Sequence, residues 1–206
     1  SGHLLMAKSM RTRLTADERR AQILRAAIKI FAKSNYRVAR VTDIASEAGI
    51  SDALIYKHFA SKKAILLAIL DYISQRMIRL WDEDVKNEKN ALTALRMVVL
   101  SYYKRMLKHP EELKVHFQAV SEICDAEIAD RLRLSYESFA DYYSKVIQKG
   151  IQQGTIRKDA DVNTVAWAIN GLGMFMNMTR LLSFTGTFKE EVLKNILDNL
   201  IDSVKN

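Results

Sequence analysis

VTDIASEAGISDALIYKHFASKKAIL, residues 41–66, is the stretch that decides the fold of this chain. Apolar residues recur in 41–48 at steps of three and four, which places them on one face of a helix. Gly49 follows, and glycine takes the left-handed conformation that ends many helices without the steric cost of a Cβ. Ser51 is a suitable N-cap for a second helix that we expect to end near Phe59. The segment therefore predicts two short helices joined by a glycine turn.

The second of these helices has an unusually polar outer face. Its spacing turns Leu54, Ile55 and Phe59 toward the core. The side chains sent to the opposite side are Asp52, Ala53, Tyr56 and Lys57. A DNA major groove is wide enough for one such helix, so this face suits contact with bases and phosphates. The alternative interpretation is a helical hairpin with a solvated face.

Residues around this segment also match the pattern of a known family. They are Phe31, Tyr36, Asp43-Ile44-Ala45, Gly49, Ile55-Tyr56, His58-Phe59 and Ser61-Lys62. Between Ala21 and Leu66 the chain thus resembles the DNA-binding domain of the TetR family of bacterial one-component regulators. Three positions depart from the family pattern: Asn35 replaces a common glycine, Arg40 a serine or threonine, and Lys63 an acidic residue. Asparagine tolerates a left-handed conformation, so the first change is harmless.

The positive charge of the chain lies with this segment. The whole chain has a net charge of +8, and residues 1–64 hold 13 Lys and Arg against 5 Asp and Glu. Residues 65–206 hold 19 of each kind. Concentrated positive charge neutralises DNA phosphates and releases their counterions, which supplies much of the binding affinity. The alternatives for a basic block are solubility and attraction to an anionic membrane.

The outer face and the resemblance together indicate which residues contact DNA. We expect phosphate contacts from Tyr56, Lys57 and Lys62, with Arg40 and Thr42 as further candidates. Base reading falls to Asp52 and Ala53, with Lys57 as a further candidate. The full predicted set is Arg40, Thr42, Ser51, Asp52, Ala53, Tyr56, Lys57, His58 and Lys62. An amino-terminal arm with Lys8, Arg11 and Arg13 is expected to reach a minor groove.

The rest of the chain predicts an all-α fold. One proline and seven glycines in 206 residues leave few breaks, and apolar residues keep helical spacing almost throughout. Besides the two short helices we expect helices at about 15–34, 61–84, 91–108, 110–124, 126–153, 162–184 and 188–204, about nine in total. Gly154 and Gly186 are expected to stop helices. The predicted divisions are an arm at 1–14, a helix-turn-helix domain at 15–60 and a larger ligand-binding and dimerisation domain at 61–206.

Several features of the sequence limit the class of protein to which it can belong. The single cysteine, Cys124, excludes an internal disulfide and fits a reducing cytoplasm. We expect it to be a small core residue, and the alternative is a redox-sensing or ligand-sensing thiol. No apolar run approaches the roughly 20 residues that span a bilayer, so neither a membrane span nor a membrane partner is expected. Ser1 to Leu4 resembles the remnant of an expression tag.

A ligand cavity is predicted in the larger domain. One face of the helix at 162–184 carries two amides among apolar residues, which suits the few fixed polar groups of an apolar pocket. The predicted lining is His116, Phe117, Val120, Tyr136, Phe139, Tyr143, Trp167, Asn170, Met174 and Asn177. The alternative is that the amides meet solvent or backbone.

A dimer surface is predicted on the last two helices. The terminal helix carries a wide apolar stripe of Phe188, Val192, Leu193, Ile196, Leu197, Leu200, Ile201 and Val204. The preceding helix would add Val165, Ile169, Leu172, Gly173 and Met176. Packing within the monomer is the alternative interpretation. A two-fold dimer reads two half-sites of a near-palindromic operator in double-stranded DNA.

The predicted function is therefore a DNA-binding transcription regulator. The resemblance implies a cytoplasmic homodimer that represses transcription and leaves its operator when an unidentified small-molecule effector, largely apolar, binds the larger domain. The alternatives are a ligand-independent architectural DNA-binding protein and an enzyme that carries a helix-turn-helix. The scattered histidines and the lack of a phosphate loop disfavour catalysis, and His116, Cys124 and Asp125 do not form a known metal-ligand spacing. We expect neither a cofactor nor a metal.

Overall fold

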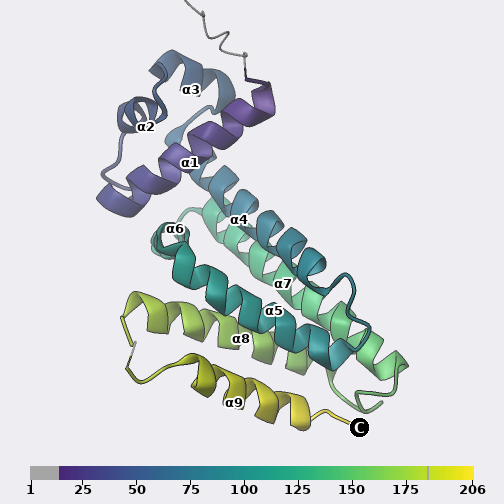
Figure 1. Ribbon diagram of the computed structural model, residues 1–206. Helices are drawn as coiled ribbons and strands as arrows, with labels where there is room; N and C mark the ends of the chain where they lie inside the picture. The colour runs from purple at the N-terminus through teal and green to yellow at the C-terminus, as the bar shows by residue number, and fades with distance from the viewer. Residues whose placement is uncertain (1–13, 185) are drawn as a thin grey trace, which may run out of the picture.

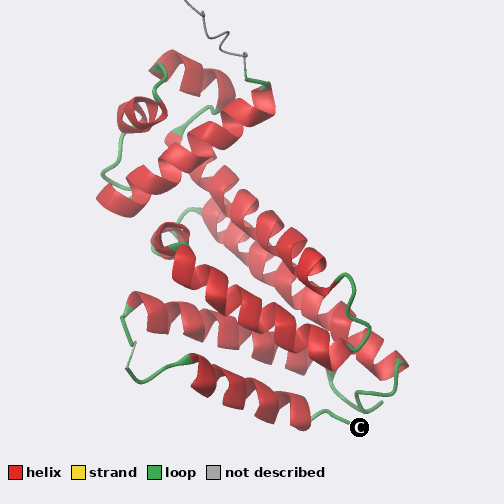
Figure 2. Ribbon diagram, viewed as in Figure 1, coloured by secondary structure: helices red, strands yellow, loops and turns green. Residues whose placement is uncertain are grey.

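The computed structural model describes residues 14–184 and 186–206, and within them it confirms the all-α prediction (Figure 2). The helices are α1 (Ala16–Ser34), α2 (Val41–Ala48), α3 (Asp52–His58), α4 (Lys62–Val85), α5 (Ala91–Lys108), α6 (Pro110–Val120), α7 (Ala126–Gln152), α8 (Val162–Leu181) and α9 (Glu190–Asp202). The predicted arm with Lys8, Arg11 and Arg13 lies outside the described residues. No helix in the described ranges is long and apolar enough to cross a membrane.

The helices form an elongated molecule with α1, α2 and α3 at one end (Figure 1). α4 starts beside α3 and runs into the other end, where it packs against α5 and α7. α7 packs along α8, and α5 contacts α8 and α9. α6 is short and contacts both α1 and the larger bundle. α4 and α6 therefore both connect the helix-turn-helix end to the rest.

Helix starts follow the predicted caps. The Thr15 side chain accepts from the backbone N–H of Glu18, and the Glu18 carboxylate accepts from the N–H of Thr15, which completes a capping box. Ser61 caps α4 by accepting from the N–H of Ala64. Gly49 ends α2 with φ at +65°, as predicted from its place after the helix. These local signals fix both the helix-turn-helix and the start of α4.

Buried apolar residues form two clusters. One joins α1, α2 and α3 to the first turns of α4, and it extends to Val115 and Ala119 of α6 and to Ile128 and Leu132 of α7. The other fills the remainder of the bundle around Trp81. The core of the helix-turn-helix end thus continues past residue 60, because α4, α6 and α7 supply part of its wall.

Three predictions about helix ends need correction. α6 ends at Val120 and not near Cys124, and the following residues form a turn. Cys124 is consequently exposed, where we expected a core residue. α8 ends at Leu181, followed by Ser183 with φ at +58°, so Gly186 is not the stop. Serine there takes the unusual conformation that the sequence assigned to glycine.

The two faces of α8 and α9 are also assigned differently from the prediction. Much of the stripe expected to bind a partner is buried inside the monomer, namely Leu193, Leu197, Ile201 and Val204 of α9 and Val165, Ile169, Leu172 and Met176 of α8. Val192 and Ile196 of the predicted α9 stripe are exposed, and other exposed apolar residues of this region are Trp167, Met174, Phe175 and Met178 on α8 and Leu182 just after it. Because α5 packs against both helices, it covers the face that the sequence left unpartnered.

Candidate DNA-binding and effector sites

The outer face of α3 lies open to solvent. Tyr56 is 54% exposed, Ala53 and Lys57 are exposed, and Asp52 is partly so. Ile55 is fully buried on the opposite side. Thr42 and Arg40, at the start of α2, are exposed as well. These side chains therefore reach outward from a short helix whose opposite side is anchored in the core, and their contact with DNA stays a prediction.

The remaining residues of the predicted DNA set have roles within the fold. Ser51 caps α3 by accepting from the N–H of Leu54. His58 ends α3, and its carbonyl accepts from Arg20 of α1 at 2.6 Å. Arg40 precedes α2, and its backbone N–H donates to the Asp43 carboxylate at 2.9 Å, which caps the start of this helix. This bond compensates for the lack of a capping serine or threonine side chain at position 40.

Long side chains of α1 fasten the ends of α2 and α3. The Arg20 guanidinium, besides donating to the His58 carbonyl, lies 4.2 Å from the centre of the Phe59 ring. Gln22 donates to the carbonyl of Ala48, the last residue of α2, at 2.8 Å. Sequence reasoning missed both residues, since a polar residue on a basic helix gives no sign that its partner is a distant carbonyl.

Lys62 has different partners from those predicted. Its ammonium donates to three backbone carbonyls of the α1–α2 loop, Tyr36 at 2.7 Å, Arg37 at 3.1 Å and Ala39 at 2.9 Å. It also lies 4.8 Å from the centre of the Tyr36 ring. An ammonium has three hydrogens, so none remains for a phosphate in this geometry. Lys62 therefore holds the loop that leads into α2.

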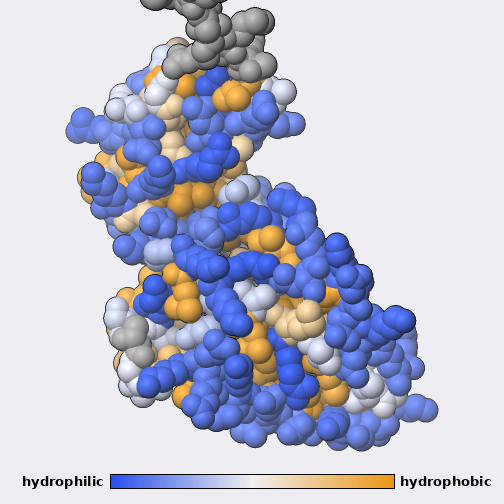
Figure 3. All heavy atoms as spheres, viewed as in Figure 1, coloured by the Kyte–Doolittle hydropathy of each residue, from blue (hydrophilic) through white to orange (hydrophobic). Residues whose placement is uncertain are grey.

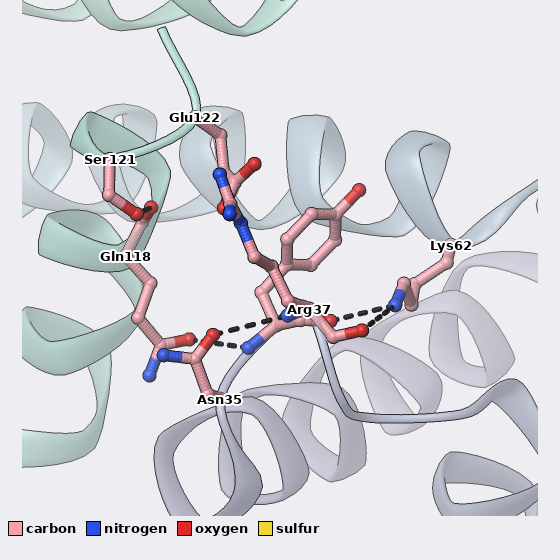
Figure 4. Close-up of polar contacts among 7 residues, drawn as sticks. Asn35, Arg37, Lys62, Gln118, Ser121 and Glu122 are labelled. Atoms are coloured by element: carbon pink, nitrogen blue, oxygen red, sulfur yellow. Dashed lines mark hydrogen bonds and ion pairs between the residues drawn. The ribbon is translucent and has the colours of Figure 1, made fainter.

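Gln118 of α6 reaches the same loop from the other side (Figure 4). Its amide oxygen accepts from the N–H of Tyr36 at 2.9 Å, and its amide nitrogen donates to the carbonyl of Phe31 at 2.9 Å. Glu122, just after α6, pairs with Arg37 of the loop. Asn35, where α1 ends, has φ at +71°, as the replacement of glycine by asparagine predicted. We call the segment 35–39, held by Lys62 and Gln118, the loop junction.

A cavity lies in the bundle between α4, α5, α6, α7 and α8. It is lined by Leu70, Ile73, Ser74, Met77, Trp81, Tyr102, Met106, Glu112, Leu113, His116, Ser135, Tyr136, Phe139, Tyr143, Asn170, Gly173, Met174 and Asn177. Its free space is about 50 Å³, enough for a few water molecules. Any larger molecule must therefore push the helices or side chains apart.

The structure brings seven of the ten predicted lining residues to this cavity: His116, Tyr136, Phe139, Tyr143, Asn170, Met174 and Asn177. The other three lie elsewhere. Phe117 and Val120 pack on the two cores, and Trp167 is 44% exposed. The α4 wall was missed because we interpreted α4 as a mechanical link only. The sequence pattern that could have predicted this wall is the row of apolar residues at helical spacing that ends at Trp81.

The polar groups of the cavity pair with each other. The Tyr102 hydroxyl and the Asn177 amide exchange two hydrogen bonds, at 3.0 and 2.7 Å. Asn170 donates to the carbonyl of Tyr136 at 2.9 Å. His116 Nε2 lies 2.7 Å from the Tyr136 hydroxyl. Both amides border the cavity, as predicted. Asn170 also bonds to a backbone carbonyl, which was the alternative prediction for these amides.

Burial keeps this cluster uncharged. It lowers the pKa of His116 to about 4, because an imidazolium there would lose its hydration. It also raises the pKa of the Tyr102, Tyr136 and Tyr143 hydroxyls. The charged lining residue is Glu112 of α6, and its carboxylate pairs with Arg76 of α4. This ion pair joins the two helices that also hold the loop junction.

Polar residues cover most of the face drawn in Figure 3, and apolar residues appear there in patches between them. A second hollow, lined by Tyr103, Met106, Leu107, Met176, Thr179, Arg180, Phe184, Phe188, Lys189 and Glu190, lies between α5, the end of α8 and the start of α9. Exposed apolar residues of α8, including Phe175 and Met178, lie on the same helix as part of its lining.

The amino-terminal helices match a family model, that of bacterial regulatory proteins of the tetR family, over residues 23–69. The chain is 25% identical over 150 residues to the fatty acid metabolism regulator protein of Bacillus subtilis, covering 73% of this chain and 77% of the relative. It is 27% identical over 172 residues to the transcriptional repressor NicS of Pseudomonas putida, covering 80% and 78%.

Solved structures share the fold. The transcriptional regulator FadR of Bacillus subtilis, in complex with stearoyl-CoA, superposes with a TM-score of 0.79 at 21% identity. The superposition covers 89% of this chain and 98% of that one. At this identity the likeness establishes the arrangement of helices.

Proposed function

Because the chain belongs to the TetR family of bacterial regulatory proteins, we propose that it represses transcription by binding an operator and releases it when a small, largely apolar molecule enters the cavity. It acts on double-stranded DNA as a homodimer in the cytoplasm. The observation that carries this proposal is that α4 and α6 each contact both the cavity and the loop junction. Cavity and reading face therefore share two rigid connections.

The first connection is α4. Its residues from Leu70 to Trp81 line the cavity, and Lys62 at its start holds the carbonyls of the α1–α2 loop. The loop leads directly into α2, and α2 fixes α3 through the turn at Gly49. A tilt of α4 would therefore move the reading helix.

The second connection is α6. Glu112, Leu113 and His116 line the cavity, and Gln118 binds the end of α1 and the loop. Since the empty cavity is small, a bound molecule must shift one or more of its walls. A ligand that favours the shifted arrangement changes the populations of the two arrangements by its difference in affinity for them. In a dimer this alters the separation of the two α3 helices, which must match half-sites about one helical turn apart.

The exposed apolar side chains of α8 and α9 are the proposed dimer face. Met178 lies within it, and Leu134 of α7, which is similarly exposed, lies outside it. Met178→Glu should raise the dimer dissociation constant by about 100-fold or more, because the dimer would bury an unpaired carboxylate. Leu134→Glu is the matched control and should leave it unchanged. Sedimentation velocity measures both, and equal behaviour of the two variants contradicts this face.

Selection of genomic fragments by the purified protein, followed by footprinting, tests the DNA-binding function. The expected result is a few enriched sites with two protected half-sites related by near-palindromic sequence. Binding without sequence preference would instead support a ligand-independent architectural protein. Mass spectrometry of small molecules that copurify with the protein gives the first candidates for the effector.

A further inference from the structure

We propose that the effector is uncharged where the cavity encloses it and that it carries a neutral oxygen acceptor, such as a ketone, ester or alcohol oxygen. This inference rests on the effector site proposed above and specifies its ligand class. It follows from three properties of the lining residues: their charges, their existing hydrogen bonds and one buried donor without an acceptor.

The charges of the lining exclude an enclosed ion. The lining residues include no lysine or arginine, and His116 is neutral at physiological pH because burial lowers its pKa to about 4. A carboxylate would therefore be buried without a counterion, which costs several kcal/mol. An ammonium could pair only with Glu112, and that would leave the Arg76 guanidinium, whose side chain is 23% exposed, without its carboxylate partner. Both ions are disfavoured for the same reason, the loss of hydration without compensation.

The existing hydrogen bonds leave little to a strongly polar ligand. Tyr102 and Asn177 satisfy each other, and Tyr136 is engaged through its hydroxyl by His116 and through its carbonyl by Asn170. A ligand rich in hydroxyl groups would have to break these pairs. The rest of the wall is aliphatic and aromatic, so most of the ligand surface must be apolar.

The indole N–H of Trp81, in the lining, lacks a partner. Trp81 is 1% exposed, and its indole N–H has no acceptor among the described residues. The Phe139, Tyr142 and Tyr143 rings lie with their centres 5.2, 5.2 and 5.3 Å from the Trp81 ring, so aromatic carbon surrounds much of the indole. A buried donor without an acceptor is costly, and buried polar groups in proteins are normally paired. A ligand oxygen that accepts from this N–H supplies the missing partner.

Three probes of equal chain length test the inference: 2-octanone, octanoate and octylammonium at pH 7.5. The chain has two tryptophans, and Trp167 is exposed, so Trp167→Phe leaves Trp81 as the single indole. In this variant, labelled with ¹⁵N, we expect 2-octanone to bind at least tenfold more tightly than either ion. It should also move the Trp81 indole proton resonance downfield, as a new hydrogen bond does.

Trp81→Phe in the same background removes the donor while keeping an aromatic ring. We expect its affinity for 2-octanone to fall about three- to tenfold, the usual range for one net hydrogen bond, while affinity for n-octane stays within twofold. Thermal melting verifies that the variant folds. Equal or tighter binding of an ion, an unmoved indole resonance with bound ketone, or no ketone binding would each overturn the inference. Fragment selection and footprinting judge the DNA-binding function separately.

Discussion

The loop junction and the cavity use polar groups in opposite ways. At the loop junction, long side chains from other helices reach backbone carbonyls, as Lys62 does three times and Gln118 does once. In the cavity, polar side chains mostly pair with each other, and the buried indole N–H of Trp81 has no acceptor among the described residues. The junction is fastened to the backbone, whereas the cavity keeps free space and unused bonding capacity. The comparison indicates that the loop junction, which positions α2 and α3, is held stiffly, whereas the cavity can adapt to a ligand.

The largest effect is expected from Lys62→Met, which removes the ammonium but keeps the apolar stem. Losing three charge-assisted bonds to carbonyls should lower the free energy of unfolding by about 3 kcal/mol, measured by urea denaturation. Lys63→Met is the matched control, because Lys63, whose side chain is 38% exposed, pairs with Asp125 and Glu127 near the surface and should matter little.

The same variant discriminates between two roles of Lys62. A phosphate contact, as the sequence suggested, predicts unchanged stability and a salt dependence of DNA binding that falls by about one unit. That outcome would contradict the fastening role and remove the contrast between junction and cavity.

The cavity should be sensitive to acid through His116. Its folded pKa of about 4 lies below the ordinary value of 6.5, so between these values the unfolded chain binds a proton that the folded chain does not. Stability from this group is therefore fully present above about pH 6.5 and is lost as the pH falls toward 4. Between pH 7 and pH 5 the loss should be about 2 kcal/mol. His116→Gln should remove this part of the pH dependence in denaturation curves, and an identical dependence in the variant would rule out His116 as its source.

A smaller effect is expected from Gln118→Leu. It leaves the Tyr36 N–H and the Phe31 carbonyl without their partner, which should cost about 1 kcal/mol of stability. If α6 carries part of the signal, the variant should also reduce the factor by which a cavity ligand weakens operator binding. Full retention of that factor would assign the coupling to α4 alone. Ser121→Ala, which removes an exposed hydroxyl that bonds only to the Gln118 carbonyl, is a local control.

The smallest effect on stability is expected from Tyr56→Ala. Its side chain is exposed and forms no hydrogen bond with the described residues, so the free energy of unfolding should change by less than about 0.5 kcal/mol. Operator binding should nevertheless weaken, and by a similar factor for all sequences if Tyr56 contacts phosphate. Unchanged DNA affinity would remove Tyr56 from the reading face.

Local signals made the helix-turn-helix predictable from sequence. Gly49, Ser51 and Ser61 act on residues within four positions of themselves, and each lies where the sequence placed it. The partners of Lys62 and Gln118 were not predictable, because they are carbonyls of residues 23 to 87 positions away whose identity leaves no mark in the sequence.

The prediction of which face of α8 is buried failed for a related reason. Both sides of this helix carry apolar residues, so periodicity alone could not decide which side α5 covers. Asn170 and Asn177 were nevertheless predicted correctly as cavity residues, since amides among apolar residues are rare enough to be informative, whereas Trp167 was not.

Operator affinity of the wild-type protein with and without a saturating cavity ligand, beginning with 2-octanone, tests the connection between input and output most directly. The account predicts that the ligand weakens operator binding by roughly 5- to 150-fold, the usual range of coupling between two sites. A ligand that moves the Trp81 indole resonance but leaves the operator dissociation constant unchanged would contradict it.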